Sequence, residues 1–264
     1  MIPASISAGG HVINSDRMWH YTEGIANWDP IWPKHGIRIL PGPSSMWFDA
    51  KGNRLKAPAI PGFDNLEALK TILSSGYDYS WFITNQKIVQ KEFALSGSEQ
   101  NPDIVSKSWI KVLQQRLLNS KATAPVEAFK QNGEDFIVAK SIEDLLNGMK
   151  KIEPNNNLDC ENIRKEIHAR DTQILNSFSK DYQIIAIHSA RKYIGDRLMR
   201  TAKPHKILDP ENGPLIAIKL NILTRKTLGG IKTNLNSQMI NAEGNEIPGL
   251  FAIGEVAGFG GGGY

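Results

Sequence analysis

Residues 229–234 read Gly-Gly-Ile-Lys-Thr-Asn, and residues 248–258 read Pro-Gly-Leu-Phe-Ala-Ile-Gly-Glu-Val-Ala-Gly. A short apolar strand that delivers Gly-Glu into a glycine-rich turn lets the backbone approach a bound nucleotide cofactor closely, because glycine carries no Cβ and tolerates positive φ. The carboxylate of Glu255 can then accept hydrogen bonds from sugar or ribityl hydroxyls, as acidic residues at strand ends do in dinucleotide-binding folds. The two stretches predict a cofactor site.

Three further motifs extend the pattern over almost the whole chain. Residues 16–24 read Asp-Arg-Met-Trp-His-Tyr-Thr-Glu-Gly, residues 41–45 read Pro-Gly-Pro-Ser-Ser, and residues 92–98 read Glu-Phe-Ala-Leu-Ser-Gly-Ser. Together with the glycine motifs they resemble FAD-dependent oxidoreductases of the fumarate reductase and 3-ketosteroid dehydrogenase group, and most closely its FAD-binding dehydrogenase subgroup. The resemblance implies FAD as the cofactor and hydride transfer as the reaction.

The resemblance also assigns the residues that would contact FAD, which are Gly229, Gly230, Gly254, Glu255, Val256, Ala257 and Gly258. Residues 258–263 formally match Gly-x-Gly-x-x-Gly. A dinucleotide fingerprint, however, needs a helix directly after the turn and an acidic residue about 20 positions further on. We therefore interpret this glycine run as backbone that passes the flavin ring.

Composition limits the classes of partner. The formal net charge of the 264 residues is +4, and Lys and Arg are scattered among Asp and Glu, so no nucleic-acid surface is predicted. Cys160 is the single cysteine, which excludes an internal disulfide and favours a reducing compartment, and a cytoplasmic location is the default expectation. No apolar run approaches the about 20 residues that a membrane-spanning helix requires, and the first residues lack the character of a signal peptide.

The pattern of apolar residues and turns divides the chain, and the resemblance implies the identity of three segments. Residues 1–44 form a flank and hinge of the flavin domain, residues 45–203 form a mostly helical cap (substrate) domain, and residues 204–264 form the C-terminal part of the FAD-binding domain. We expect a hairpin at residues 45–55, a helix after Ser141, a helix from Cys160 to Leu175, a strand at residues 214–220 and a turn at residues 243–245. Residues 65 to about 152 carry a helical apolar pattern, which includes Trp109, Val112, Leu113 and Leu117.

The fold class that follows is α/β, or α+β for the segment alone, with a helical cap domain inserted into an incomplete FAD-binding domain. Relatives of this kind open with a strand, a Gly-x-Gly-x-x-Gly turn and a helix, and close with a further helix that faces the flavin. Neither feature lies in these residues. We therefore expect an internal part of a longer protein that is inactive by itself.

Residues 16–23 gather acidic, basic, aromatic and imidazole side chains in one octet. A flavin dehydrogenation couples a hydride to the flavin with a proton to a side chain, so Tyr21 and His20 are candidates to exchange that proton, with Tyr21 preferred. Arg17 could orient a carboxylate or carbonyl. The alternative is structural: Trp19 and Tyr21 as core aromatics, with Asp16 and Arg17 paired on the surface.

Arg225 and Lys226 precede the Gly-Gly motif and are candidates to bind substrate. Fumarate reductases have His-Thr-Met where residues 226–228 read Lys-Thr-Leu, and Thr-Arg-Asp where residues 56–60 read Lys-Ala-Pro-Ala-Ile. Fumarate reduction is therefore not predicted. His11, His35, His168, His188 and His205 show no spacing typical of a metal site, and none is predicted.

The sequence therefore predicts part of a flavoprotein oxidoreductase acting on CH–CH groups. It would transfer a hydride between FAD and a small organic substrate, at a carbon–carbon bond next to an electron-withdrawing group. The alternative is a non-catalytic helical binding domain, or an inactive segment that no longer holds FAD. The sequence points to no particular electron acceptor.

Overall fold

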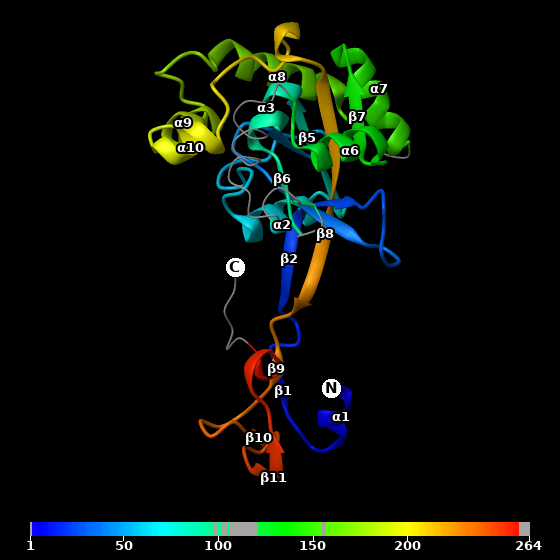
Figure 1. Ribbon diagram of the computed structural model, residues 1–264, viewed down its shortest axis with the longest axis vertical. Helices are drawn as coiled ribbons and strands as arrows, with labels where there is room; N and C mark the ends of the chain where they lie inside the picture. The colour runs from blue at the N-terminus through cyan, green and yellow to red at the C-terminus, as the bar shows by residue number, and fades with distance from the viewer. Residues whose placement is uncertain (1, 98–99, 102–104, 106–120, 155–156, 259–264) are drawn as a thin grey trace. The chain divides into compact units, whose positions relative to one another are not determined.

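The computed structural model describes residues 2–97, 100, 101, 105, 121–154 and 157–258 (Figure 1). It divides the chain into two compact units, which are described separately. Unit 1 is drawn from residues 1–20 and 224–264, and unit 2 from residues 21–223. The domain boundaries expected from the sequence, at residues 44/45 and 203/204, both lie inside unit 2.

Unit 1 is built from short elements. They are α1 (Ile2–Ser7), β1 (Val12–Ile13), β9 (Gly230–Ile231), β10 (Gln238–Ile240), β11 (Glu246–Phe251) and the 3-10 helix η3 (Gly254–Ala257). β1 pairs with β9 and β10 pairs with β11, both antiparallel. The turn predicted between the last two strands is confirmed, since Gly244 adopts φ 89° and the Asn241 nitrogen donates to the Asn245 carbonyl oxygen at 2.9 Å. A small apolar core joins Ile231, Met239 and Ala252.

Unit 2 contains a mixed set of strands and helices. The strands are β2 (Met18–Ala26), β3 (Gly36–Leu40), β4 (Met46–Asp49), β5 (Tyr79–Asn85), β6 (Ala94–Leu95), β7 (Phe136–Ala139) and β8 (Leu215–Thr227), of which β2 and β8 each continue into unit 1. The helices are α2 (Asn65–Ser74), α3 (Gln86–Glu92), α6 (Ala124–Asn132), α7 (Ile142–Ile152), α8 (Cys160–Gln173), α9 (Tyr182–Ala190), α10 (Ile194–Met199) and the 3-10 helix η2 (Pro210–Asn212).

One sheet organises unit 2, in the order β4-β5-β8-β2-β3-β6, with β7 also pairing with β8. The pairs β2–β3, β3–β6, β4–β5, β5–β8 and β7–β8 are antiparallel. The expected hairpin at residues 45–55 is confirmed, because Phe48 bridges Arg54 and the Leu55 nitrogen donates to the Trp47 carbonyl oxygen at 2.9 Å. An antiparallel sheet covered by helices is the α+β form of the predicted fold class.

Strand alternation divides the core of unit 2 into two clusters. Side chains of successive strand residues point to opposite faces, so Trp81 and Phe82 of β5 enter different clusters. Phe82 packs with residues of α2 and α6, whereas Trp81 packs with residues of α7 and α8. Strand β5 is buried along its whole length, which places it between these two apolar layers.

Side-chain caps start helices α7 and α8 at the residues where the sequence predicts these helices to begin. The Ser141 hydroxyl accepts a hydrogen bond from the Asp144 nitrogen at 3.1 Å at the start of α7. The Asp159 carboxylate accepts one from the Asn162 nitrogen at 2.9 Å at the start of α8. Such caps satisfy backbone donors that a helix leaves unpaired in its first turn.

The strands β5, β6 and β7 interrupt the region that the sequence predicts as mostly helical. Tyr79–Asn85 has no polar face because it is covered on both sides, so its periodicity does not distinguish a strand from a buried helix. The helical pattern expected at Trp109, Val112, Leu113 and Leu117 lies outside the described residues. From residue 121 to residue 203 helices do predominate among the described residues.

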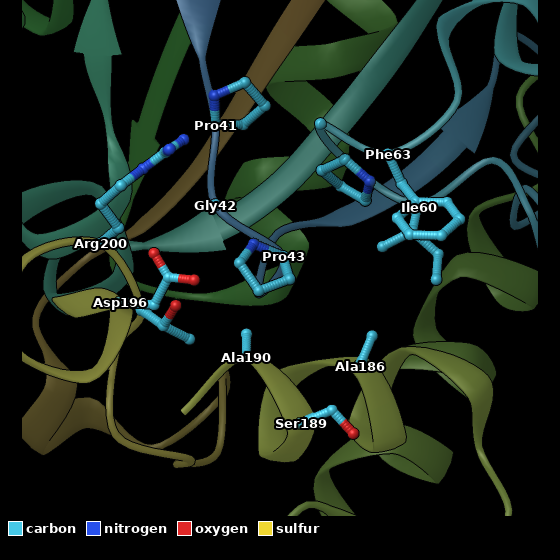
Figure 2. Close-up of a pocket in the computed structure, with 13 residues that line it drawn as sticks. Pro41, Gly42, Pro43, Ile60, Phe63, Ala186, Ser189, Ala190, Asp196 and Arg200 are labelled. Atoms are coloured by element: carbon cyan, nitrogen blue, oxygen red, sulfur yellow. The ribbon is translucent and has the colours of Figure 1, made fainter. Parts of the chain in front are cut away.

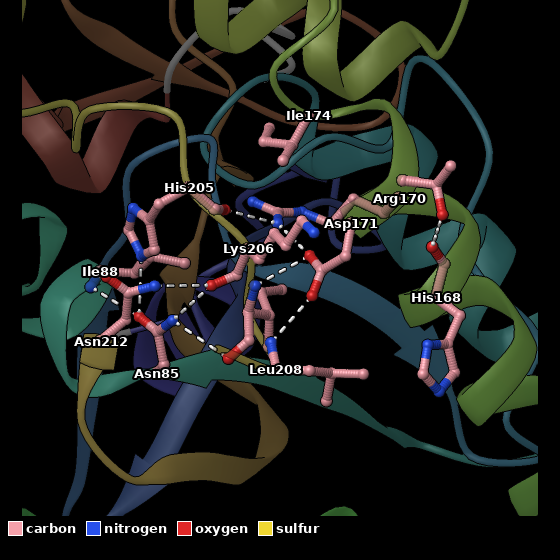
Figure 3. A network of polar contacts seen from close by, with 12 residues as sticks. Asn85, Ile88, His168, Arg170, Asp171, Ile174, His205, Lys206, Leu208 and Asn212 are labelled. Carbon is pink, nitrogen blue, oxygen red and sulfur yellow. Dashed lines mark hydrogen bonds and ion pairs between the residues drawn. The ribbon is translucent and has the colours of Figure 1, made fainter. Parts of the chain in front are cut away.

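A polar network anchors the segment that leads into β8 (Figure 3). Asp171 of α8 accepts hydrogen bonds at 2.8 Å from the backbone nitrogens of Ile207 and Leu208 and from the Arg170 guanidinium. Asn85, at the end of β5, contacts the His205 ring at 3.1 Å and caps α3 through the Ile88 nitrogen, also at 3.1 Å. These contacts hold residues 203–213 against the sheet.

Candidate functional site

The two glycine motifs of the sequence meet in unit 1, where β9 packs on η3. A Cβ added to Gly230 would lie 2.6 Å from the Val256 carbonyl oxygen and would overlap the Gly258 nitrogen. A Cβ added to Gly229 would lie 2.6 Å from the Ile13 carbonyl oxygen. These backbone atoms cannot retreat as a flexible side chain could, so the approach of β9 to η3 requires glycine.

The turn around η3 needs glycine for its conformation as well. Gly254 adopts φ 66° and Gly258 adopts φ 76°, which residues with a Cβ rarely do. Nothing lies within 4 Å of a Cβ added to Gly254, so this side of the turn is open. The open backbone at Gly254 leaves room for a flat cofactor, and Gly254, Glu255 and Gly258 are the residues that would hold it.

An ion pair lies beside this turn. The Lys226 ammonium contacts the Glu255 carboxylate, and the ammonium also lies 5.2 Å from the ring centroid of Trp19. The side chains of Lys226 and Glu255 are 31% and 60% exposed, so solvent reaches both. The structure therefore brings together a predicted substrate-binding residue and a predicted cofactor-binding residue.

Within unit 1, the first residues of the octet at residues 16–23 contact the segment that precedes Gly229-Gly230. The Arg17 carbonyl oxygen accepts hydrogen bonds from the Leu228 nitrogen at 2.9 Å and from the Thr227 hydroxyl at 3.2 Å. The Arg17 side chain is exposed, and the His20 ring lies 3.4 Å from the Met18 carbonyl oxygen. The Arg225 side chain lies outside the part of the chain that the structure describes.

Tyr21 begins unit 2 and has a partner there. The guanidinium carbon of Arg38 lies 4.0 Å from the centroid of the Tyr21 ring. Arg38 also forms an ion pair with Glu23, with the Arg38 Nε and the Glu23 Oε2 3.6 Å apart. Tyr21 and Trp19 are half-buried rather than core residues, which departs from the structural alternative for the octet.

Unit 2 also contains a pocket of about 390 Å³ (Figure 2). Figure 2 shows Pro41 and Pro43 on one wall, Ile60 and Phe63 on another, and Ala186 and Ala190 of α9 turned toward them. The charged residues Asp196 and Arg200 line the end of the pocket next to α10. The walls suit an apolar ring system, and one end can pair with a polar group.

A buried carboxylate fixes the wall of the pocket. Glu92 accepts hydrogen bonds from the Ser44 hydroxyl at 2.5 Å, the Ser44 nitrogen at 2.9 Å and the Ala202 nitrogen at 2.8 Å. Burial raises the pKa of Glu92, and these hydrogen bonds offset the rise only in part. A Cβ added to Gly42 would lie 2.5 Å from the Glu92 Oε2, so glycine is required between this carboxylate and the pocket.

Sequence reasoning missed these unit 2 residues as functional candidates. The Pro-Gly-Pro motif contributed to the family resemblance, but nothing in the sequence places it next to α9 and α10. Arg38 lies in an ordinary strand pattern, and only its distance to Tyr21 singles it out. Among residues 2–97, 100, 101, 105, 121–154 and 157–258, no His, Cys, Asp and Glu group gathers that could hold a metal ion.

The whole chain, residues 1–264, matches the model of the family described as FAD binding domain, and the chain belongs to that family. It is 54% identical over 263 residues to a KsdD-like steroid dehydrogenase of Mycolicibacterium smegmatis and 53% identical to one of Mycobacterium tuberculosis. Both alignments cover 100% of this chain. They cover 48% of the Mycolicibacterium smegmatis protein and 46% of the Mycobacterium tuberculosis protein. The chain thus spans about half the length of the curated relatives it matches.

Solved structures share the fold. A 3-ketosteroid delta1-dehydrogenase from Sterolibacterium denitrificans, in complex with 1,4-androstadiene-3,17-dione, aligns with a TM-score of 0.57 at 15% identity and covers 97% of this chain and 41% of its own. A flavocytochrome c3 fumarate reductase in an open conformation aligns with a TM-score of 0.53 at 14% identity. This alignment covers 97% of this chain and 34% of the fumarate reductase chain. Among the described helices, none has the length and apolar character needed to span a bilayer.

Proposed function

We propose that this member of the FAD binding domain family is part of an oxidoreductase that removes a hydride and a proton from adjacent carbons of a steroid-like ketone. The observation that carries the proposal is the backbone contact of the Gly229-Gly230 and Val256–Gly258 motifs in unit 1, in a chain more than half identical to KsdD-like steroid dehydrogenases. When bound, FAD supplies the two-electron acceptor for the hydride.

The roles of the octet follow from this reaction. The carbon next to a ketone loses its proton more readily than an isolated methylene, so the enzyme needs a base there and a group to polarise the ketone oxygen. Tyr21 or His20 accepts the proton, with Tyr21 preferred. Arg17, Arg225 and Lys226 are the cations that could orient the ketone, and the exposure of Lys226 leaves it accessible to a ligand.

The pocket in unit 2 supports an apolar substrate. It is lined by proline, isoleucine, phenylalanine and alanine side chains, and its volume of about 390 Å³ is within the range of small-molecule sites. We assign the pocket to the ring system of the substrate, with Arg200 or Asp196 facing a polar substituent. The cytoplasmic location expected from the sequence is part of the same proposal.

Anaerobic mixing of 3-ketosteroids with the FAD-loaded protein that contains this chain tests the function. We expect a 3-ketosteroid to bleach the flavin absorbance and the product to carry one more carbon–carbon double bond. A preparation with stoichiometric FAD that no ketosteroid bleaches would overturn the proposal.

Filling the pocket tests its assignment separately. Ala186→Trp places an indole among the pocket walls, whereas Ile185→Trp enlarges a neighbouring, half-exposed position of the same helix. We expect the first change to raise the steroid KM by at least about 10-fold and the second to leave it nearly unchanged, because only the first removes space from the pocket. Equal KM values in the two variants would contradict the assignment.

A further inference from the structure

Arg38 and Tyr21 form a stacked pair in unit 2. Tyr21 lies on β2 and Arg38 on β3, two adjacent strands of the sheet. The distance of 4.0 Å from the guanidinium carbon to the ring centroid places the cation against the face of the ring. Only 20% of the Arg38 side chain is exposed, so water competes little with this contact.

Two further side chains hold the edge of the Arg38 guanidinium. The Glu23 carboxylate is fully buried and lies 3.6 Å from the Arg38 Nε. The Asn65 amide has one orientation that forms hydrogen bonds with both Glu23 and Arg38. In this orientation the amide nitrogen donates to the Glu23 Oε1 at 3.1 Å, and the amide oxygen accepts from the Arg38 Nη2 at 3.3 Å. Glu23 and Asn65 thus fix the edge of the guanidinium while its face rests on Tyr21.

The backbone of Arg38 is fixed as well. Its nitrogen donates to the Ser96 hydroxyl at 3.1 Å, and its carbonyl oxygen accepts from the Ser96 nitrogen at 2.9 Å. Burial raises the pKa of Glu23, and the charge of Arg38 is the largest influence that lowers it. Apolar side chains would fill such a site at less cost than a buried ion pair, so stability alone does not account for this arrangement.

We infer that Arg38 is a positioning residue for Tyr21, which fixes the plane of the ring so that the phenol oxygen stays in place to exchange a proton with the substrate. The inference rests on the proposed function of Tyr21. Arginine suits this role better than lysine, because a planar guanidinium can bind two groups along its edge and stack on a ring at the same time. A lysine ammonium has no such plane.

A double-mutant cycle tests whether Arg38 acts through Tyr21. We would measure ketosteroid-dependent flavin reduction by rapid mixing in the FAD-loaded protein, for Arg38→Met, Arg38→Lys, Tyr21→Phe and the Arg38→Met/Tyr21→Phe pair. Phe keeps the ring and removes only the phenol oxygen. We expect Arg38→Met to slow the reaction by about 10- to 100-fold with little change in steroid KM, and Arg38→Lys to recover part of the rate.

The decisive comparison is the effect of Arg38→Met in the two backgrounds. If Arg38 acts through the phenol, the change has almost no effect once Tyr21 is Phe. An equal slowing in both backgrounds would overturn the inference, because Arg38 would then act independently of the phenol. An unchanged rate in Tyr21→Phe would instead overturn the proposed function of Tyr21, and with it the catalytic reason for the positioning.

A spectroscopic measurement reports the positioning itself, without FAD or substrate. The chain contains 6 tyrosines, which ring-labelled NMR can follow separately. Arg38→Met should shift the Tyr21 resonances and speed rotation of its ring while leaving the signals of Tyr182 in place. The matched control is Arg54→Met, because the guanidinium carbon of Arg54 lies 4.9 Å from the Tyr182 ring centroid. This substitution should disturb the Tyr182 signals instead. Unchanged Tyr21 signals in Arg38→Met would contradict the inference.

Discussion

Unit 1 and unit 2 build their candidate sites from different parts of the polypeptide. In unit 1, β9 approaches η3 through backbone atoms, and Gly230 leaves no space for a Cβ. In unit 2, Tyr21, Glu23 and Arg38 meet through side chains, and Glu23 is fully buried. The charged pair of unit 1, Lys226 and Glu255, is partly exposed to solvent.

The difference indicates a division of tasks. A backbone surface without side chains recognises the shape of a cofactor, whereas interlocked side chains determine the position of a reacting group. Substitutions where β9 meets η3 in unit 1 should therefore change FAD affinity, and substitutions around Tyr21 should change the rate of reaction at full FAD occupancy. Three predictions test this division, and a fourth tests the buried carboxylates of unit 2.

The largest effect is expected in unit 2. Tyr21→Phe should slow flavin reduction by about 10²- to 10⁴-fold, the usual contribution of a positioned acid or base, while FAD content stays stoichiometric. His20→Ala should have the smaller effect, because Tyr21 is the preferred proton acceptor. Rapid mixing together with the flavin-to-protein ratio measures both quantities. Loss of FAD in Tyr21→Phe would break the division between the units.

Gly230→Ala should have the largest effect in unit 1. The added Cβ would overlap backbone atoms of Val256 and Gly258, and overpacking of this kind typically costs about 1–3 kcal/mol. We expect FAD affinity to fall by at least about 10-fold, since η3 must move. Titration of the apoprotein with FAD measures this.

Gly244→Ala is the matched control for that change. Gly244 also lies in unit 1, adopts φ 89° and has nothing within 4 Å of an added Cβ. Its cost is therefore conformational alone, about 1–2 kcal/mol of stability, and FAD affinity should stay close to the original value. Equal losses of FAD affinity in Gly230→Ala and Gly244→Ala would mean that unit 1 responds to destabilisation in general rather than to the position of η3.

Glu255→Ala should weaken FAD binding by about 1–3 kcal/mol, because hydroxyl groups of the cofactor would lose a charged acceptor. Lys226→Met removes the ion-pair partner of Glu255 but keeps the carboxylate, and should leave FAD affinity nearly unchanged when no substrate is present. Flavin fluorescence titration compares the two variants. An equal loss in both would indicate that Glu255 acts only through its pairing with Lys226.

The smallest effect concerns pH and the buried carboxylates of unit 2. Because burial raises the pKa of Glu92, its contribution to the free energy of unfolding is present at low pH and is lost as pH rises above about 4.5. The stability of the wild type relative to Glu92→Gln should therefore fall with rising pH, by at most about 1.4 kcal/mol per pH unit. Denaturant unfolding between pH 4 and pH 8, in about unit steps, measures this slope.

Glu127 provides a control of opposite sign. Burial acts to raise its pKa, but hydrogen bonds from Lys130, Gln86 and Ala122 outweigh burial and lower it. Its contribution is therefore present above about pH 4.5 and is lost as pH falls, so the wild type should gain stability relative to Glu127→Gln as pH rises. The difference in stability between the wild type and each Gln variant should therefore change with pH in opposite directions for Glu92 and Glu127. A change in the same direction would contradict the assignment of Glu92 as a carboxylate destabilised by burial.

Features set by neighbouring residues were predictable from the sequence. The caps at Ser141 and Asp159 and the turn at Gly244 form within about four residues, and the local sequence contains all the groups involved. The pairing of Gly229-Gly230 with Gly254–Gly258 was predictable only through the family resemblance. The motif itself shows why glycine is needed but not which backbone will approach it.

Only the tertiary structure decided the remaining features. β5 could not be predicted as a strand, because a segment covered on both faces has no polar side to reveal its period. The contact of Tyr21 with Arg38 depends on how the side chains of two neighbouring strands pack, and the pocket between the Pro41–Pro43 loop and α9 joins residues that are far apart along the chain. Such contacts depend on which distant segments the sheet brings together, and side-chain identity in a single sequence does not encode that choice locally.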